Sequence, residues 1–192
     1  MDGSSDEELI IKLKAGNGQA FKVLYERYSN KLFNYLNHYT GNRQLAEDVL
    51  QDTFIVVYEK IGEYREEGNF QAWLFKIAIN FAKKGFRRGK RESLSLSKPF
   101  RDTKEDLQNY IPDTHPTISD NLEKIELNKE ILKIINKLPA NYKQVVLLHD
   151  IEGLRYKDIA EIMGVKEAMI GLWLQRARQQ LYNLFKSKGL GK

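Results

Sequence analysis

Residues 153–165 read Gly-Leu-Arg-Tyr-Lys-Asp-Ile-Ala-Glu-Ile-Met-Gly-Val, which has the spacing of a helix-turn-helix. Ile159 supplies an apolar core position, the small Ala160 lets two helices cross closely, and Gly164 can adopt the left-handed conformation that ends the first helix. A longer helical period follows over residues 166–185. In a DNA-binding helix-turn-helix the second helix enters the major groove. Such turns also join helices in ordinary bundles, so this stretch favours DNA binding without deciding it alone.

The rest of the chain also has a helical period. Apolar residues recur at steps of three and four, which is the period of a helix with one buried side. No alternation of apolar and polar residues is long enough to predict a strand. The periodic segments are residues 6–15, 19–39, 45–61, 69–91, 122–138, 142–151 and 156–163. We therefore predict an all-α fold.

The composition changes between residues 93 and 120. Ser, Pro and scattered acidic residues replace the apolar period there, which is typical of a flexible linker. We expect two small helical domains, residues 1–92 and 121–192, joined by a linker at 93–120. The second domain contains the helix-turn-helix.

The composition excludes several kinds of chemistry. The 192 residues include no Cys and only three His, which leaves no thiolate catalysis, disulfides, iron–sulfur clusters or the usual structural zinc sites. We expect no cofactor and no metal. There is no Walker loop, HExxH motif or Gly-x-Ser-x-Gly elbow, and the adjacent His149 and Asp150 point in different directions on a helix. We therefore expect that the protein is not an enzyme.

The sequence also predicts where the protein is found. No stretch approaches the roughly 20 apolar residues that a membrane span needs, and the acidic start lacks the regions of a secretory signal. We expect no membrane insertion and a cytoplasmic location. The formal charge is +5, from 31 Lys and Arg against 26 Asp and Glu, and its distribution along the chain is more informative than the total.

Cations gather at the end of the helix predicted over 69–91, with six in the nine residues 83–91. A basic face that also carries an aromatic ring and an amide suits nucleic acid, because cations meet phosphates, rings stack on bases and amides bind base edges. A solvated helix end that complements the macrodipole is the alternative. The candidate DNA-binding residues are Trp73, Lys76, Asn80, Lys83, Lys84, Arg87 and Arg88.

The helix predicted over 45–61 has the opposite character. Asp48, Gln51, Asp52, Ile55 and Glu59 follow one another on the side away from its apolar stripe. We expect an acidic face with an exposed aliphatic residue, which suits a protein partner better than DNA. A merely solvated face explains the same period equally well.

Several stretches resemble bacterial sigma factors of the sigma-70 family. The resemblance lies in Ala-Glu-Asp-Val-Leu-Gln-Asp-Thr-Phe at 46–54, Phe-Gln-Ala-Trp-Leu-Phe-Lys-Ile-Ala-Ile-Asn at 70–80, Leu-Pro at 138–139, Glu-Gly-Leu at 152–154, residues 156–165 and Arg-Ala-Arg at 176–178. The short two-domain form resembles the extracytoplasmic-function (ECF) group of that family.

The resemblance implies a sigma factor that binds core RNA polymerase and directs promoter recognition, DNA melting and transcription initiation. The first domain would bind the clamp helices of the β′ subunit through Asp48, Gln51, Asp52 and Ile55, and the minus-10 element through the basic face. The linker would thread the polymerase near its active centre. The second domain would touch the flap of the β subunit and read the minus-35 element, with candidates Arg155, Lys157, Lys166, Gln175, Arg176 and Arg178. An anti-sigma factor is a further partner that the resemblance implies.

Two features depart from the family pattern. Arg155 and Lys166 precede the two helices where Ser or Thr is common, and neither side chain can accept a hydrogen bond from a helix terminus, so both caps should be weaker. Residues 168–174 are nearly free of polar groups, although the family commonly has basic residues near Gly171 and Trp173. Either minus-35 recognition is unusual or part of this helix faces a protein.

A second hypothesis is a two-module helix-turn-helix regulator that binds DNA without joining polymerase. It has no use for the acidic face around Asp52. Charge reversal at Asp52 separates the hypotheses, because only a sigma factor would lose transcription while it keeps its affinity for DNA.

Overall fold

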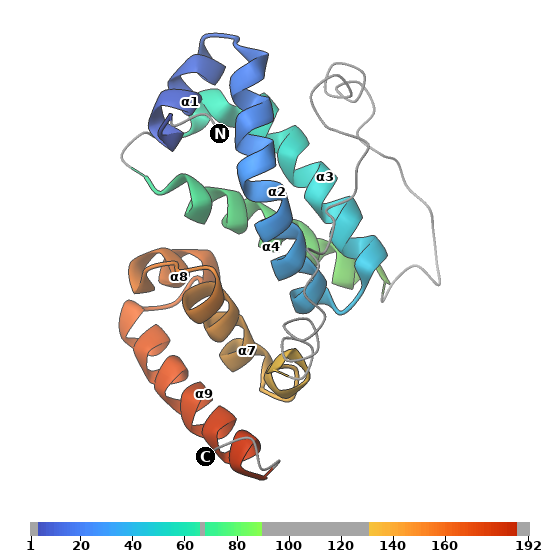
Figure 1. The fold of residues 1–192 in the computed structure, drawn as a ribbon, viewed down its shortest axis with the longest axis vertical. Helices are drawn as coiled ribbons and strands as arrows, with labels where there is room; N and C mark the ends of the chain where they lie inside the picture. Colours follow the sequence, from blue (N-terminus) through green and yellow to red (C-terminus); the bar gives the residue numbers. More distant parts are fainter. Residues whose placement is uncertain (1–3, 66–67, 90–130, 188–192) are drawn as a thin grey trace. The chain divides into compact units, whose positions relative to one another are not determined.

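The computed structural model describes residues 4–65, 68–89 and 131–187, and over these ranges the chain is helical with turns and contains no strand. The predicted all-α fold is therefore confirmed. The chain divides into two compact units, Met1–Thr117 and Ile118–Lys192 (Figure 1). The predicted linker at 93–120 lies outside the described residues.

The first unit contains four α-helices among its described residues. They are α1 (Asp6–Lys14), α2 (Gly18–Thr40), α3 (Arg43–Lys60) and α4 (Phe70–Gly89), with a short 3-10 helix, η1 (Ile61–Glu63), after α3. The helices α2, α3 and α4 pack against one another, and α1 packs against α2 (Figure 1). The helices α3 and α4 are therefore neighbours, and each has one side exposed to solvent.

Local signals fix where these helices begin and end. Ser5 and Glu8 form the predicted capping box, in which the Glu8 N–H donates to Ser5 Oγ at 3.2 Å and the Ser5 N–H donates to Glu8 Oε2 at 3.3 Å. Gly41 ends α2 in the left-handed conformation, with φ +65°. Asn69 precedes α4 and accepts a hydrogen bond from the Ala72 N–H at 3.4 Å, as expected of an N-cap.

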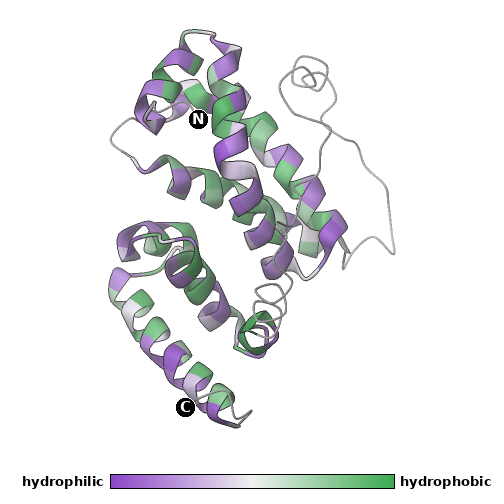
Figure 2. Cartoon of the chain, viewed as in Figure 1, coloured by the Kyte–Doolittle hydropathy of each residue, from purple (hydrophilic) through white to green (hydrophobic). Residues whose placement is uncertain are grey.

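Aromatic rings fill the core of the first unit. Phe21, Tyr35, Phe54 and Phe75 are each at most 1% exposed, and the rings of Phe21 and Phe54 meet edge to face with centroids 6.1 Å apart. Figure 2 shows both hydrophobic and hydrophilic residues along the helices, as amphipathic helices require. These rings bury large apolar areas and stabilise the unit together with the buried Leu, Ile and Val residues around them.

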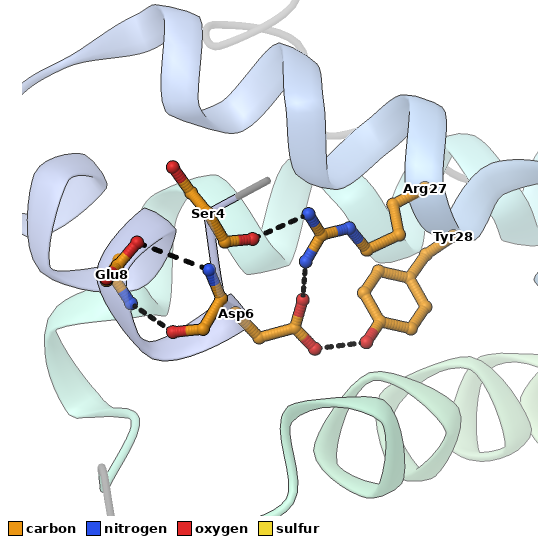
Figure 3. A network of polar contacts seen from close by, with 6 residues as sticks. Ser4, Asp6, Glu8, Arg27 and Tyr28 are labelled. Carbon is orange, nitrogen blue, oxygen red and sulfur yellow. Dashed lines mark hydrogen bonds and ion pairs between the residues drawn. The ribbon is translucent and has the colours of Figure 1, made fainter. Parts of the chain in front are cut away.

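A polar network fastens the start of α1 to α2 (Figure 3). The Asp6 carboxylate accepts hydrogen bonds from Arg27 Nη1 and from the Tyr28 hydroxyl, and Arg27 Nη2 donates to the Ser4 carbonyl oxygen at 2.8 Å. Burial, followed by the hydrogen bond to Asp6, raises the pKa of Tyr28 above its ordinary value of 10.0. Tyr28 therefore stays neutral in the folded protein at any physiological pH.

The second unit is built around the helix-turn-helix. It contains a helical segment at residues 131–135, then α7 (Ala140–Val146), the π-helical segment η2 (Leu147–Ile151), α8 (Tyr156–Met163) and α9 (Glu167–Ser187). The helix α9 packs against α7 and α8. The core of this unit includes Ile134, Val145, Leu148, Ile159, Ile170 and Leu174, each at most 1% exposed.

The described ranges contain no helix long and apolar enough to cross a membrane. Within the same ranges, no group of three or more His, Asp or Glu side chains is placed to hold a metal ion.

Candidate protein and nucleic-acid interfaces

The outer side of α3 is acidic, as the sequence predicts. Asp48, Gln51, Asp52 and Glu59 are exposed on it. The Gln44 side-chain amide donates to Asp48 Oδ1 at 3.4 Å, which orients that carboxylate along the helix. This surface, defined by Asp48, Gln51 and Asp52, is called the acidic surface below.

Ile55 does not belong to the exposed part of this surface. The expectation that it is exposed is wrong, because its side chain is only 6% exposed. Ile55 lies nearly opposite Ala46 around the helix axis, and Ala46 is itself fully buried. A helical wheel gives the direction of a side chain but does not show what covers the second side of a helix. The acidic surface therefore offers two carboxylates and an amide, without an aliphatic neighbour.

The outer side of α4 is basic. Asn80, Lys83 and Lys84 are exposed, and Lys76 is half-buried. Lys84 Nζ lies 5.7 Å from the centroid of the Phe81 ring, a cation–π distance that holds the ammonium group close to the helix. Lys76, Asn80, Lys83 and Lys84 are called the basic surface below. Arg87 and Arg88 lie in α4 by their backbone, but their side chains are outside the described residues.

An aromatic cluster stands at the N-terminal end of α4. The half-buried Trp73 ring has its centroid 5.2 Å from that of Tyr64 and 6.0 Å from that of Phe70. The Tyr64 hydroxyl donates to the Gly68 carbonyl oxygen at 2.6 Å, and Lys14 Nζ donates to the Tyr64 carbonyl oxygen at 3.0 Å. Trp73 is thus held in place on one side while part of the ring stays accessible. Sequence reasoning missed Tyr64, because it precedes the helix and follows no helical period.

The helix-turn-helix of the second unit has its expected geometry. Gly164 ends α8 in the left-handed conformation with φ +70°, and the Val165 N–H donates to the Ala160 carbonyl oxygen at 3.0 Å. Ile159 and Ile170 are fully buried between the two helices. The turn therefore fixes α9 against α8, with the first two turns of α9 partly open to solvent.

Arg155 stands at the N-cap position of α8 and makes no cap hydrogen bond, as its chemistry predicts. Its guanidinium instead forms a double hydrogen bond with Asp158, from Nε to Oδ2 at 2.9 Å and from Nη2 to Oδ1 at 3.2 Å. These bonds raise the pKa of the Arg155 guanidinium. The pair holds Asp158 in the first turn of α8, where a negative charge is favourable.

The cations of α9 differ in their surroundings. Arg178 is turned towards η2, with Nη2 2.5 Å from Asp150 Oδ1 and Nε 3.4 Å from Asp150 Oδ2. Hydrogen bonding to Asp150 raises the pKa of the Arg178 guanidinium. Lys157, Lys166, Gln175 and Arg176 are exposed. Gln175 and Arg178 share a shallow hollow whose other lining residues are Tyr156, Gly171, Leu174, Gln179 and Tyr182.

Family comparisons match both units. Residues 24–92 match the model of sigma-70 region 2, and residues 128–181 match that of sigma-70 region 4. The chain is 34% identical over 187 residues to the ECF RNA polymerase sigma-E factor of Haemophilus influenzae, which covers 93% of this chain and 94% of that protein. It is 30% identical to the RNA polymerase sigma-H factor of Pseudomonas aeruginosa, over 92% of this chain and 91% of that protein.

Solved structures agree with the sequence comparisons. The sigma factor RpoE of Bartonella quintana, solved in complex with the anti-sigma factor NepR, is 25% identical with a TM-score of 0.65, covering 86% of this chain and 96% of that one. CnrH, solved in complex with the cytosolic domain of CnrY, has the same fold, with a TM-score of 0.68 at 22% identity over 96% of this chain and 99% of that one. The chain belongs to the sigma-70 family, in its ECF group.

Proposed function

We propose that this protein is an ECF sigma factor whose acidic surface binds core RNA polymerase, while its basic surface and its helix-turn-helix bind promoter DNA. The observation that carries this assignment is the opposite charge of two neighbouring helices in one unit. Asp48 and Asp52 are exposed on α3, and Lys83 and Lys84 are exposed on α4. A protein that bound only DNA would gain nothing from exposed carboxylates beside its phosphate-binding helix, because they repel phosphates.

The basic surface suits the opened minus-10 strand. Taking a base out of the stack costs a few kcal/mol, and stacking on an aromatic ring returns about 1–3 kcal/mol per base. The partly accessible Trp73 ring, fixed by Tyr64 and Phe70, would supply such a platform. Asn80 is exposed two turns further along α4 and has an amide that can bind a base edge. Lys83 and Lys84 would hold the backbone phosphates.

The two DNA contacts would support each other. When one module is bound, the tether raises the effective concentration of the other at its own element. We assign the first module to residues 1–92, the linker to 93–120 and the second module to 121–192. Within the second module, the candidate minus-35 contacts remain Arg155, Lys157, Lys166, Gln175, Arg176 and Arg178, although Arg155 and Arg178 are held by Asp158 and Asp150.

The remaining assignments follow from the same role. A sigma factor supplies recognition and leaves catalysis to the polymerase, so we propose no enzymatic activity and a cytoplasmic location. An anti-sigma factor is a proposed partner, supported by the relative from Bartonella quintana that was solved bound to one. In the polymerase, the proposed contacts are the clamp helices of β′ for the acidic surface and the flap of β for the second module.

Charge reversal tests the assignment of the acidic surface. Asp52→Lys should abolish co-purification with core RNA polymerase and transcription in vitro. Glu26→Lys is the matched control, because Glu26 is exposed on α2 and the substitution changes the net charge equally. Binding of core by Asp52→Lys at the level of Glu26→Lys would contradict the proposal. If the unaltered chain binds DNA but does not bind core RNA polymerase, the result favours the alternative hypothesis of a helix-turn-helix regulator that acts without polymerase.

A further inference from the structure

The outer side of α9 is apolar at its N-terminal end. Ala168 is exposed, and Met169 and Leu172 are each 37% exposed. Ile170 and Leu174, which point to the other side of the same turns, are at most 1% exposed and form core. Ala168, Met169 and Leu172 therefore form an apolar strip in the part of the helix that a helix-turn-helix inserts into the major groove.

Ala168 and Leu172 carry no hydrogen-bonding atom, and the Met169 thioether is only a weak acceptor. Bases are also read in the major groove by apolar contact, because thymine alone among the four bases carries a methyl group there. On the basis of the proposed DNA binding by this module, we infer that the apolar strip recognises thymine methyl groups in the minus-35 element. Leu172 is the main reading residue, because it is large and lies almost directly opposite the buried Ile170.

The charges around the strip favour DNA over a protein partner as its occupant. Lys157 and Lys166 are exposed near the N-terminal ends of α8 and α9, and Arg176 is exposed one turn beyond Leu172 on the same side of the helix. In a duplex the phosphates flank the major groove and the thymine methyl groups lie inside it. The cations around the strip can therefore meet phosphates while the apolar side chains meet methyl groups. Glu167 is an exposed acid in the first turn of α9, but at 100° per residue it lies about 140° around the helix from Leu172, away from the strip.

Uracil provides a probe that differs from thymine by the methyl group alone. A library of randomised DNA duplexes is amplified in parallel with dTTP or with dUTP, and each pool is selected with the full chain assembled on core RNA polymerase. We expect thymine at fixed upstream positions in the first pool and loss of that preference in the second. A selected duplex is then remade with single deoxyuridines. Affinity should fall about four-fold at each contacted position, as about 0.8 kcal/mol per buried methyl group predicts.

Two variants assign the effect to the strip. Leu172→Ala should bring the thymine-to-uracil affinity ratio close to one at a contacted position. Ile151→Ala should keep the ratio, because Ile151 is an exposed aliphatic residue of the same unit, at 52%, and lies in η2. The ratio is taken within one variant, so a change in overall affinity does not affect it.

Three results would overturn the inference. If both pools select the same sequences with equal affinity, the strip does not read methyl groups while the proposed promoter binding stands. If Leu172→Ala weakens association with core but keeps the thymine preference, the strip faces a protein. If neither pool yields bound duplexes, the proposed DNA binding fails and this inference fails with it.

Discussion

Arg178 on α9 and Asp150 on η2 are joined by two hydrogen bonds, Nη2 to Oδ1 at 2.5 Å and Nε to Oδ2 at 3.4 Å, across 28 residues of sequence. The pair is largely open to solvent, with side chains 54% and 31% exposed, so it contributes at most about 1 kcal/mol to stability. Its larger consequence is for binding, because Asp150 neutralises a cation that would otherwise be available to a phosphate.

Asp150→Asn should therefore strengthen binding to DNA. Each additional phosphate contact steepens the fall of log affinity with log salt by about 0.9, so the slope should increase in magnitude by about that amount. The measurement is a salt titration of duplex binding by the full chain on core polymerase. Adding Arg178→Ala to Asp150→Asn should remove the gain. An unchanged slope for Asp150→Asn alone would show that Arg178 does not reach a phosphate.

Two helical glycines should respond differently to alanine. Gly171→Ala should stabilise the second unit by up to about 1 kcal/mol, because a Cβ there would lie 3.6 Å from Tyr156 Cε2, an ordinary contact. Gly85→Ala should give little gain or a loss in the first unit, since its Cβ would lie 2.7 Å from Leu45 Cδ1. Denaturation followed by Trp73 and Trp173 fluorescence, in single-Trp backgrounds, reports each unit. Equal stabilisation by both substitutions would contradict the close approach of Leu45 to Gly85.

Tyr28 should make the first unit sensitive to alkaline pH. Its pKa is raised in the folded state, so above pH 10.0 the unfolded chain loses this proton more readily and the free energy of unfolding falls as the pH rises. Tyr28→Phe should cost about 1.5–3 kcal/mol at pH 7, because the lost hydrogen bond is to the charged Asp6 carboxylate. It should also make the alkaline loss of stability smaller. Tyr25 and Tyr39, whose pKa values are also raised by burial, should contribute in the same direction.

Asn80→Ala and Lys83→Ala should change DNA binding in different ways. Both are exposed, so neither alanine variant should unfold the protein. Lys83→Ala should weaken binding to all promoters and reduce the salt slope by about 0.7, as expected for one phosphate contact on a single strand. Asn80→Ala should relax the preference at one position of the minus-10 element and leave the slope unchanged. Competition binding with a panel of single-base minus-10 variants separates the two, and identical profiles would refute the assigned roles.

Local signals in the sequence predict most of the fold. The capping box at Ser5, the left-handed glycines at Gly41 and Gly164, and the apolar periods place the helices to within a few residues, because each depends on neighbours along the chain. The contacts that bring distant residues together are not predictable in this way. The Arg178–Asp150 pair, the Tyr64–Trp73 contact and the burial of Ile55 all depend on tertiary packing.

Parts of the candidate interfaces are likewise predictable from the sequence, whereas other parts depend on tertiary packing. The charges of α3 and α4 follow from their periods, so the exposure of Asp48, Gln51, Asp52, Asn80, Lys83 and Lys84 is predicted correctly. Ile55 is buried instead, and the side chains of Arg87 and Arg88 lie outside the described residues. The apolar end of α9 is also visible in the sequence, but its exposure is not, because Met169 and Leu172 could equally have been core. Only the packing of Ile170 and Leu174 against the rest of the unit settles which side of the helix is open.

Transcription in vitro is the most direct test of the proposed sigma-factor role. Core RNA polymerase is incubated with fragmented genomic DNA of the source organism, with and without the full chain, and the 5′ ends of the transcripts are mapped. We expect a set of start sites that requires the chain, shares one upstream sequence pattern and disappears with Asp52→Lys. Start sites identical to those of core polymerase alone, obtained with a folded chain, would contradict that role.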